Sequence, residues 1–282
     1  MDAPFIFQRD VLKGKVAFVT GGASGIGYGI STRLAMAGAD LVIASRRVEK
    51  CEEVAAELSE KYGVRAIGRR LDVRYSEAVN EVMKDAVETM GQLDILVNNS
   101  AGNFYYPSHM LTDNMWNAVV GIDLFGTFYC SRAAFPYLKD RGGLIVSTSM
   151  TLHYTGWTGM APACAAKAGI DAITKTFALE WGRFGIRVNA VAPGPIITEG
   201  VEKAFAAGGD FAEWEKEMPL QRAGQPHEIG DLIVYMASPA ATWMTGSIIV
   251  LDGGEWLSPR RAGLDPEALE QMAPMLRPSH KK

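Results

Sequence analysis

The sequence has little cysteine, no long apolar run and no block of like charge. Its three cysteines among 282 residues, Cys51, Cys130 and Cys164, lie far apart and form no CxxC pair, which argues against a zinc site and a disulfide framework. No stretch is long and apolar enough to span a bilayer. The net charge of -4 comes without a run of Lys and Arg, so nucleic acid is not an expected partner. These absences favour a folded protein with reduced thiols and no metal.

Targeting patterns are also missing from both ends. The N-terminus begins Met1-Asp2-Ala3-Pro4 and lacks a basic segment followed by an apolar run, so no signal peptide is predicted. The last residues, 279–282, do not form an SKL-type peroxisomal address. The sequence therefore predicts a cytoplasmic location. Residues 258–282 are rich in Pro, Arg and Lys and are expected to form a loosely held tail or an oligomer contact, with no catalytic role.

What is present is an ordinary globular composition, 48% apolar and 21% charged, with a regular alternation of patterns. Short β-branched or apolar runs predict seven strands, and the segments between them have helical spacing. The predicted strands are residues 15–20, 39–45, 66–69, 93–98, 144–148, 187–192 and 247–251. Continuous apolar runs indicate strands buried on both faces. The fold class is therefore α/β, a Rossmann-type doubly wound parallel sheet of seven strands with helices on both faces, in one domain over residues 1–257.

A glycine-rich turn follows the first predicted strand and opens a helix. Glycine allows a tight turn and close backbone approach to a pyrophosphate, while a helix N-terminus offers free N–H groups and a partial positive charge. Glycines also mark ordinary turns, but the strand before and the helix after favour a dinucleotide site. The residues expected at the cofactor here are Gly21, Ala23, Ser24, Gly25, Ile26 and Gly27.

Two arginines stand at the end of the second predicted strand, where an NAD enzyme normally carries an acidic residue. Arg46 and Arg47 suit charge-assisted bonds to a 2'-phosphate, so NADP(H) is the predicted cofactor. The alternative is that both simply begin a solvated helix. Asp72, after the third strand, is a candidate acceptor for the adenine amino group, with a helix cap as its alternative role.

Several motifs together resemble the short-chain dehydrogenase/reductase family over roughly residues 12–256. They are residues 20–27, Asp72, the run Asn98-Asn99-Ser100-Ala101-Gly102, Lys167 and the run Pro193-Gly194-Pro195-Ile196. The resemblance implies that Lys167 contacts the nicotinamide ribose. It also implies that Val73, Asn99, Pro193, Gly194 and Ile196 bind the cofactor.

The family's proton-donating residues are largely missing. The tyrosine position, four residues before Lys167, holds Ala163, which has no proton to give. The serine position falls at Met150, next to Ser149, and the relay asparagine position holds Asp123. A ketone reductase without its acid loses on the order of a hundredfold in rate or more, so the reaction is expected to differ.

Reduction of a conjugated thioester fits the remaining groups. Hydride added at the far end of a 2,4-dienoyl thioester leaves a dienolate, which needs its proton at the α-carbon, and Asp123 is the candidate source, directly or through a water. The run Ser100-Ala101-Gly102-Asn103-Phe104 and Asp123 resemble the peroxisomal-type branch of 2,4-dienoyl-CoA reductases. The expected reaction is NADPH-dependent reduction of 2,4-dienoyl-CoA to 3-enoyl-CoA in unsaturated fatty acid degradation.

The same resemblance supplies substrate contacts and an assembly state. Asn103 and Phe104 are expected to line the acyl end, while Arg74 and Lys203 face phosphates of coenzyme A or the cofactor. A flap over about residues 197–217 is expected to cover the substrate. A homotetramer is expected by analogy only.

Several of these residues have a purely structural role as the alternative to a functional one. Asp123 has a structural role as its alternative, and Tyr154 and Trp157 either wall the acyl site or merely pack. His153 is expected to hydrogen-bond rather than to act as an acid. Helical spacing over residues 166–181 predicts a buried face, which makes a lysine at its start a costly choice without function. That face is assigned to Ala168, Ile170, Ile173 and Phe177.

Two other functions remain open. One is an NADP-dependent carbonyl or 3-ketoacyl reductase in which Ser149, Tyr154 or a water replaces the lost acid. The other is a catalytically silent NADPH-binding sensor.

Overall fold

In a computed structural model of the chain, seven parallel strands form one sheet in the order β3-β2-β1-β4-β5-β6-β7. The structure describes residues 4–199, 215–216, 218–257 and 270–272. The predicted fold class is confirmed, and each predicted strand is present with ends within two residues of the prediction. The strands are β1 Val16–Thr20, β2 Asp40–Ser45, β3 Ala66–Arg70, β4 Ile95–Asn98, β5 Gly143–Thr148, β6 Ile186–Pro193 and β7 Ile248–Leu251.

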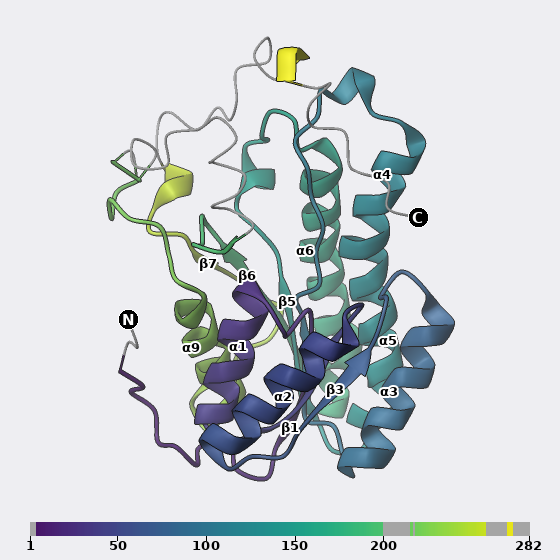
Figure 1. Cartoon of the computed structure of the whole chain (residues 1–282), viewed down its shortest axis with the longest axis vertical. Coiled ribbons are helices and arrows are strands. Elements are labelled where there is room, and N and C mark those ends of the chain that lie inside the picture. The colour runs from purple at the N-terminus through teal and green to yellow at the C-terminus, as the bar shows by residue number, and fades with distance from the viewer. Residues whose placement is uncertain (1–3, 200–214, 217, 258–269, 273–282) are drawn as a thin grey trace.

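Helices cover both faces of the sheet and build two apolar layers (Figure 1). The helices α1, α2 and α9 enclose one layer with the sheet, and α3, α5 and α6 enclose the other. Their bounds are α1 Gly25–Met36, α2 Val48–Tyr62, α3 Ser76–Met90, α4 Asp113–Val120, α5 Gly126–Leu138, α6 Ala161–Trp181 and α9 Pro226–Ala237. The inner strands β1, β4 and β5 carry fully buried aliphatic residues because both of their faces are covered.

The strand order reverses between β1 and β4. The chain winds outward from β1 to β3, then returns to the other side of β1 and continues outward to β7. In open parallel sheets, ligands bind at such a switch point, in the crevice beyond the carboxyl ends of the strands. The fold therefore places its binding crevice over β1 and β4.

A π-helical turn, Gly121–Phe125, interrupts the helical run between α4 and α5. Its centre, Asp123, is buried, while Phe125 at its end is half-exposed. The turn packs closely, since a Cβ on Gly126 would lie 2.6 Å from Cγ2 of Val73. Single π turns within α-helices frequently occur at functional sites because they redirect one side chain.

Helix α6 differs from its predicted form. It begins at Ala161, with Pro162 in its first turn, five residues before the predicted start. Ile170 and Phe177 are buried as predicted, but Ala168 is exposed. The prediction for Ala168 was wrong because the buried face contains polar residues that apolar spacing does not reveal. These are Lys167, Asp171 and Thr174.

Two predicted segments lie largely outside the described residues. They are most of the flap at residues 197–217 and nearly all of the tail at residues 258–282, so both stay predictions. None of the helices in the described ranges has the length and hydropathy needed to cross a bilayer.

Candidate active site

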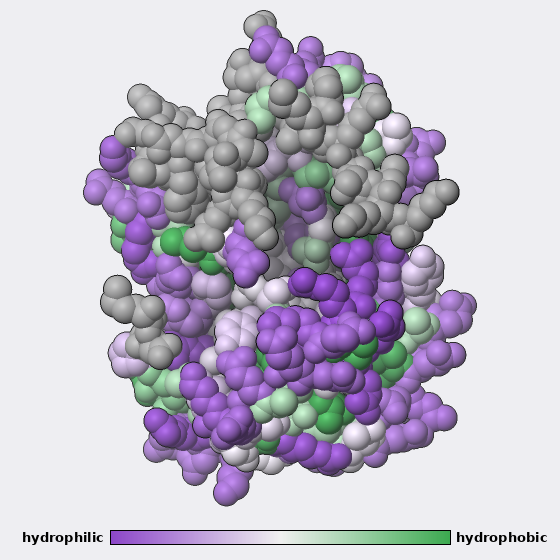
Figure 2. All heavy atoms as spheres, viewed as in Figure 1, coloured by the Kyte–Doolittle hydropathy of each residue, from purple (hydrophilic) through white to green (hydrophobic). Residues whose placement is uncertain are grey.

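A cavity of about 540 Å³ opens at the carboxyl ends of the inner strands. Its wall combines residues that follow β1, β2, β3, β4 and β5, which are far apart in the sequence. A hollow is visible on this part of the surface (Figure 2). Volumes of this size are typical of small-molecule and cofactor sites. The lining residues are Gly21, Ser24, Gly25, Ile26, Ser45, Arg46, Arg47, Leu71, Asp72, Val73, Asn99, Ser100, Ala101, Ile122, Thr148 and Thr198.

The glycine-rich turn forms one side of this cavity in a shape that side chains would block. Gly21 and Gly25 have φ of 65° and 52°, a region that residues with a Cβ rarely adopt. A Cβ on Gly27 would strike the Gly21 carbonyl oxygen and lie 2.6 Å from Nδ2 of Asn99. The turn leads into α1, whose N-cap Ser24 makes no side-chain cap bond, so the first N–H groups of the helix are left for a ligand. This cradle fits the diphosphate of a dinucleotide.

Arg46 and Arg47 lie on the cavity wall where β2 ends. Both side chains are exposed, and Arg47 is also the N-cap of α2. Within the described part of the chain, no carboxylate forms an ion pair with either arginine. The two guanidiniums therefore remain able to bind a phosphate at this end of the cavity.

Asp72 lines the same cavity and is bound by Arg74. The Arg74 Nη2 lies 2.6 Å from Asp72 Oδ2, and the backbone N–H of Arg74 donates to Oδ1 at 3.1 Å. Burial raises the pKa of Asp72, but the hydrogen bonds from Arg74 and the charges of Arg74 and Arg46 outweigh it and lower the pKa overall. The N-cap of α3 is Tyr75, so the helix-cap alternative for Asp72 is wrong. Arg74, expected at a substrate or cofactor phosphate, is held against Asp72.

The centre of the site is a buried ion pair between Asp123 and Lys167. Lys167 Nζ lies 3.3 Å from Asp123 Oδ2 and donates to the Thr148 carbonyl oxygen at 2.8 Å. The Gly102 N–H donates to Asp123 Oδ1 at 2.8 Å. Asp123 and Lys167 are only 1% and 5% exposed, so each charge depends on its partner. The structure thus brings together the two residues assigned to catalysis, with a donor facing each carboxylate oxygen of Asp123.

No tyrosine occupies the position four residues before Lys167. Ala163 is there, 2% exposed, in an apolar cluster with Val119 and Met160. Partly buried residues complete this cluster, among them Phe104, Tyr105, Met150, Leu152, Trp157 and Cys164. Phe104 therefore lies in an apolar environment, as a residue at an acyl chain should, whereas Asn103 is exposed.

Other predicted site residues lie apart from the cavity wall. Ala23 is buried in the apolar layer beneath α1, and Gly27 lies close to the Gly21 carbonyl oxygen. Pro193 ends β6, and Gly194 follows it, packed so closely that a Cβ would lie 2.6 Å from the Asp252 Cβ. Ile196 pairs with Gly224 in an isolated bridge. Lys203 lies outside the described residues.

Several lining residues were missed by sequence reasoning. Ser45, Leu71, Ser100, Ala101, Ile122 and Thr148 all line the cavity. Ser45, Leu71 and Thr148 directly follow or end a strand, and that position was the signal that would have found them. Thr148 and Gly102 contribute backbone groups. Almost any residue type could supply these groups, so the sequence does not reveal them.

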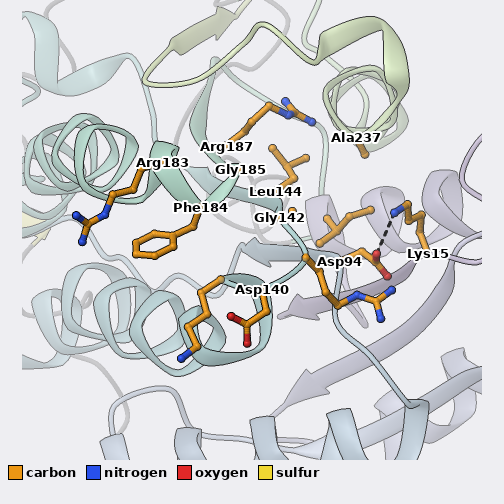
Figure 3. A pocket seen from close by; sticks show the side chains of 14 residues that line it. Lys15, Asp94, Asp140, Gly142, Leu144, Arg183, Phe184, Gly185, Arg187 and Ala237 are labelled. Atoms are coloured by element: carbon orange, nitrogen blue, oxygen red, sulfur yellow. Dashed lines mark hydrogen bonds and ion pairs between the residues drawn. The ribbon is translucent and has the colours of Figure 1, made fainter.

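A second cavity of about 480 Å³ lies at the opposite, amino-terminal end of the sheet (Figure 3). Several of its basic side chains bind other groups of the protein. Lys15 pairs with Asp94 at 3.0 Å, and Arg187 donates to the Met244 and Met236 carbonyl oxygens. It lacks the glycine turn and the Asp123–Lys167 pair, so the chemistry is assigned to the carboxyl end.

Known proteins resemble this chain in sequence and in fold. A family model described as enoyl-(acyl carrier protein) reductase matches residues 21–255. The chain belongs to the short-chain dehydrogenase/reductase family. It is therefore an oxidoreductase, and membership implies a nicotinamide dinucleotide cofactor, which the glycine cradle fits.

Solved structures of the short-chain dehydrogenase family superpose on most of the chain. A short chain dehydrogenase from Bacillus anthracis has a TM-score of 0.79 and 40% identity, covering 87% of this chain and 98% of its own. A putative short-chain alcohol dehydrogenase from Sinorhizobium meliloti has a TM-score of 0.81 and 35% identity, covering 89% of this chain and 100% of its own.

Relatives within the family include 2,4-dienoyl-CoA reductases. The peroxisomal, (3E)-enoyl-CoA-producing enzyme of Danio rerio is 42% identical over 90% of this chain and 85% of its own length. A probable 2,4-dienoyl-CoA reductase of Bacillus subtilis, named as (2E)-enoyl-CoA-producing, is 40% identical over 87% of this chain and 98% of its own. The resemblance predicted from the motifs is thus confirmed, and the relatives' names differ in the position of the product double bond.

Proposed function

We propose that the protein reduces 2,4-dienoyl-CoA to 3-enoyl-CoA with NADPH. The observation that carries the proposal is the buried Asp123–Lys167 pair in a site where Ala163 replaces the usual tyrosine acid. The site retains a lysine for the cofactor and a carboxylate for proton handling, and lacks a donor placed for a carbonyl oxygen. Relatives at about 40% identity named as 2,4-dienoyl-CoA reductases support the same substrate.

The reaction consumes one hydride and one proton. A bound reduced nicotinamide supplies the hydride, which forms a C–H bond at C5 of the dienoyl chain. The π electrons shift toward the thioester, and the resulting dienolate takes a proton at C2, which leaves the double bond between C3 and C4. The sum is 2,4-dienoyl-CoA, NADPH and H⁺ giving 3-enoyl-CoA and NADP⁺.

Asp123 and Lys167 control that proton. Because both carboxylate oxygens of Asp123 already accept from donors, a proton passes most readily through a water bound to this pair. Lys167 is fixed by the Thr148 carbonyl, so its ammonium remains between Asp123 and the ribose expected beside it. The pair thereby supplies a proton to carbon without a hydroxyl acid.

NADPH is proposed over NADH because of the charges where β2 ends. Arg46 and Arg47 face the cavity, and β2 ends at Ser45 with no acidic residue there for the ribose hydroxyls. Asp72 is the nearest acid on the wall, and Arg74 engages it.

The acyl chain is assigned to the apolar cluster around Ala163, with Phe104 and Trp157 in its wall. Coenzyme A carries several phosphates, and Arg74 and Lys203 stay candidates for them, together with the flap at residues 197–217. The homotetramer and the cytoplasmic location likewise remain proposals.

Protonation at C4 in place of C2 would give a 2-enoyl product from the same hydride transfer. The Bacillus subtilis relative is named for that product and the Danio rerio relative for the 3-enoyl product. Asp123 in place of the relay asparagine resembles the peroxisomal branch, which supports the 3-enoyl assignment.

The decisive experiment mixes purified protein with NADPH and a medium-chain 2,4-dienoyl-CoA and follows the loss of nicotinamide absorbance. NADH and a 3-ketoacyl-CoA are run in parallel, and the product double bond is located by NMR. We expect NADPH oxidation with the dienoyl substrate alone and a 3-enoyl product.

Each of the other two outcomes would indicate a different function. Oxidation only with the ketone would establish a carbonyl reductase, although Ser149 is already committed to Asp171 through a 2.6 Å bond. Tight NADPH binding without turnover of any thioester would establish a silent sensor.

A further inference from the structure

A buried polar cluster lies one helical turn beyond Lys167 and has no role in the reaction described above. It consists of Asp171, Ser149 and His153. The Asp171 carboxylate accepts from Ser149 Oγ at 2.6 Å through Oδ1, and His153 Nε2 lies 2.8 Å from its Oδ2. The side chains of His153 and Asp171 are 8% and 9% exposed. Asp171 therefore joins two segments to α6 in a place with little water.

The cluster fastens α6 to the end of β5 at successive residues. Lys167 bonds to the Thr148 carbonyl, and Asp171, four residues later on the same helix face, bonds to the Ser149 hydroxyl. His153 adds a third connection, from the short helix Leu152–Tyr154 (η3) in the loop that follows β5. The Asp171 carboxylate thus holds this loop in a fixed position relative to Lys167.

The loop, residues 150–160, forms much of the apolar cluster assigned to the acyl chain. Leu152, Trp157 and Met160 all belong to that cluster, opposite Phe104 and Tyr105. Its far end is also tied down, because the Tyr106 N–H donates to the Gly159 carbonyl oxygen at 2.9 Å. At its near end, Thr151 Oγ1 lies 3.4 Å from Glu255 Oε2, a long contact. The 2.8 Å contact between His153 and Asp171 is shorter than this one and ties the near end of the loop to α6.

We propose that His153 is a positioning residue, which through Asp171 holds the loop at residues 150–160 in register with Lys167 and so sets the affinity of the site for the acyl thioester. The inference rests on the proposed dienoyl-CoA reduction. His153 acts through the loop and not on the reacting atoms, because its Nε2 is committed to Asp171.

Loss of this tether has a specific signature. Removing the imidazole leaves one oxygen of a buried carboxylate without its donor, and hydrogen bonds to charged groups contribute more than neutral ones. The loop then relaxes, and the wall of the acyl site moves. The glycine turn and Arg46, which hold the cofactor, do not depend on this loop.

The test compares two amides of different length. In His153→Gln, the side-chain amide nitrogen reaches the position of Nε2 and still donates to Asp171. In His153→Asn, the amide is one carbon shorter and falls short of Asp171. Thr155→Val serves as the control, because Thr155 is exposed in the same loop and bonds only to the neighbouring Gly156 carbonyl oxygen.

We expect His153→Asn to raise KM for a medium-chain 2,4-dienoyl-CoA by about tenfold, with kcat changed less than about threefold. KM for NADPH should not change. His153→Gln should restore a KM near that of the wild type, and Thr155→Val should match the wild type throughout. Hydrogen exchange of the NADPH-bound protein should show faster exchange over residues 150–160 in His153→Asn only.

Three results would overturn the inference. An unchanged KM in His153→Asn would show that the tether does not position the wall. A fall in kcat at constant KM would assign His153 to the chemical step, and unchanged exchange in the loop would remove the tether itself. If the wild type does not reduce the dienoyl substrate, the proposed function fails instead, and the exchange experiment alone still decides whether His153 holds the loop.

Discussion

At the scale of single residues, the proposed chemistry depends on one carboxylate whose surroundings are unusual. Asp123 is enclosed in apolar packing, yet each of its oxygens faces a donor, Gly102 N–H and the Lys167 ammonium. A carboxylate so placed has a fixed direction and a fixed partner. Replacing it by an amide keeps the shape and removes the charge, which makes the substitution a clean test.

We expect Asp123→Asn to lower kcat for dienoyl-CoA reduction by about a hundredfold or more, because a positioned proton-transfer group contributes that much. The affinity for NADPH, measured by fluorescence titration, should change little. Asp113→Asn is the matched control, since Asp113 is an exposed acid in the first turn of α4. Full activity in Asp123→Asn would remove Asp123 from the proton path.

The proposed preference for NADPH rests on the guanidiniums where β2 ends. We expect Arg46→Ala to raise KM for NADPH by about tenfold or more while leaving KM for NADH nearly unchanged, since only NADPH carries the 2'-phosphate. Steady-state kinetics with both cofactors measure the ratio. Arg183→Ala, at the opposite end of the sheet, is the control, and an equal loss for both cofactors would contradict the assignment.

The pair of Asp72 and Arg74 makes stability depend on pH. Because the pKa of Asp72 is lowered in the folded protein, its charged form stabilises the fold above the unfolded pKa of about 3.9, and this stabilisation is lost as pH falls through the lower folded value. Both side chains are partly exposed, so the pair contributes only about 1 kcal/mol. Urea unfolding of the cofactor-free protein should show Asp72→Asn less stable than the wild type at pH 7, with the difference shrinking as pH falls below about 3.9. A constant difference across this range would contradict the ion-pair account.

At the scale of elements, the turn between β1 and α1 tolerates no side chain where it closes. A Cβ at Gly27 would meet the Gly21 carbonyl oxygen and the Asn99 amide. We expect Gly27→Ala to lower the free energy of unfolding by about 2 kcal/mol or more and to weaken NADPH binding. Thermal unfolding with and without NADPH measures both effects.

Gly182→Ala is the matched control for that prediction. Gly182 has φ of -54°, and no heavy atom lies within 4 Å of its ideal Cβ. The substitution should leave stability unchanged or raise it slightly, because alanine restricts the unfolded chain more than glycine does. Equal losses in both variants would show that close packing at Gly27 is not the cause.

The strands were predictable from the sequence, whereas the π turn was not. A buried parallel strand appears as a short continuous apolar run, and runs such as residues 95–97 need no tertiary information to be recognised. The π turn at Gly121–Phe125 differs from an α-helix by one backbone register, and its residue types fit either form. Where the chain adopts the π turn in place of an α-helical turn, Gly126 packs closely against Val73. Sequence patterns do not record such tertiary contacts.

The candidate site was predictable where function restricts residue type, as at the glycine turn, Arg46 and Asp123. It was not predictable where backbone groups act or where partners come from distant segments. Thr148 offers only its carbonyl to Lys167, and Asp171 meets His153 through a loop whose path the sequence does not specify. Asp171 also lies on the buried face of α6, which the apolar spacing had assigned to Ala168 instead.

At the scale of the whole molecule, the expected assembly has four chains. Large apolar side chains remain on the surface, with Trp243 fully exposed and Leu179 at 86% exposure. Covering such residues is a common reason for association. Light scattering after size exclusion should give a mass four times that of the chain, and a stable monomer at micromolar concentration would contradict the tetramer.

The π turn has a consequence for how this chemistry is gained or lost. A π turn contains one residue more than an α-helical turn, so deleting one residue from Gly121–Phe125 would restore a regular helix while α4 and α5 keep their places in the fold. Asp123 would leave its place between Gly102 and Lys167 without any change of its own identity. If Asp123 handles the proton as proposed, its position is encoded in the length of a helix, and a single codon deleted there would alter the reaction in a way that no scan of substitutions samples.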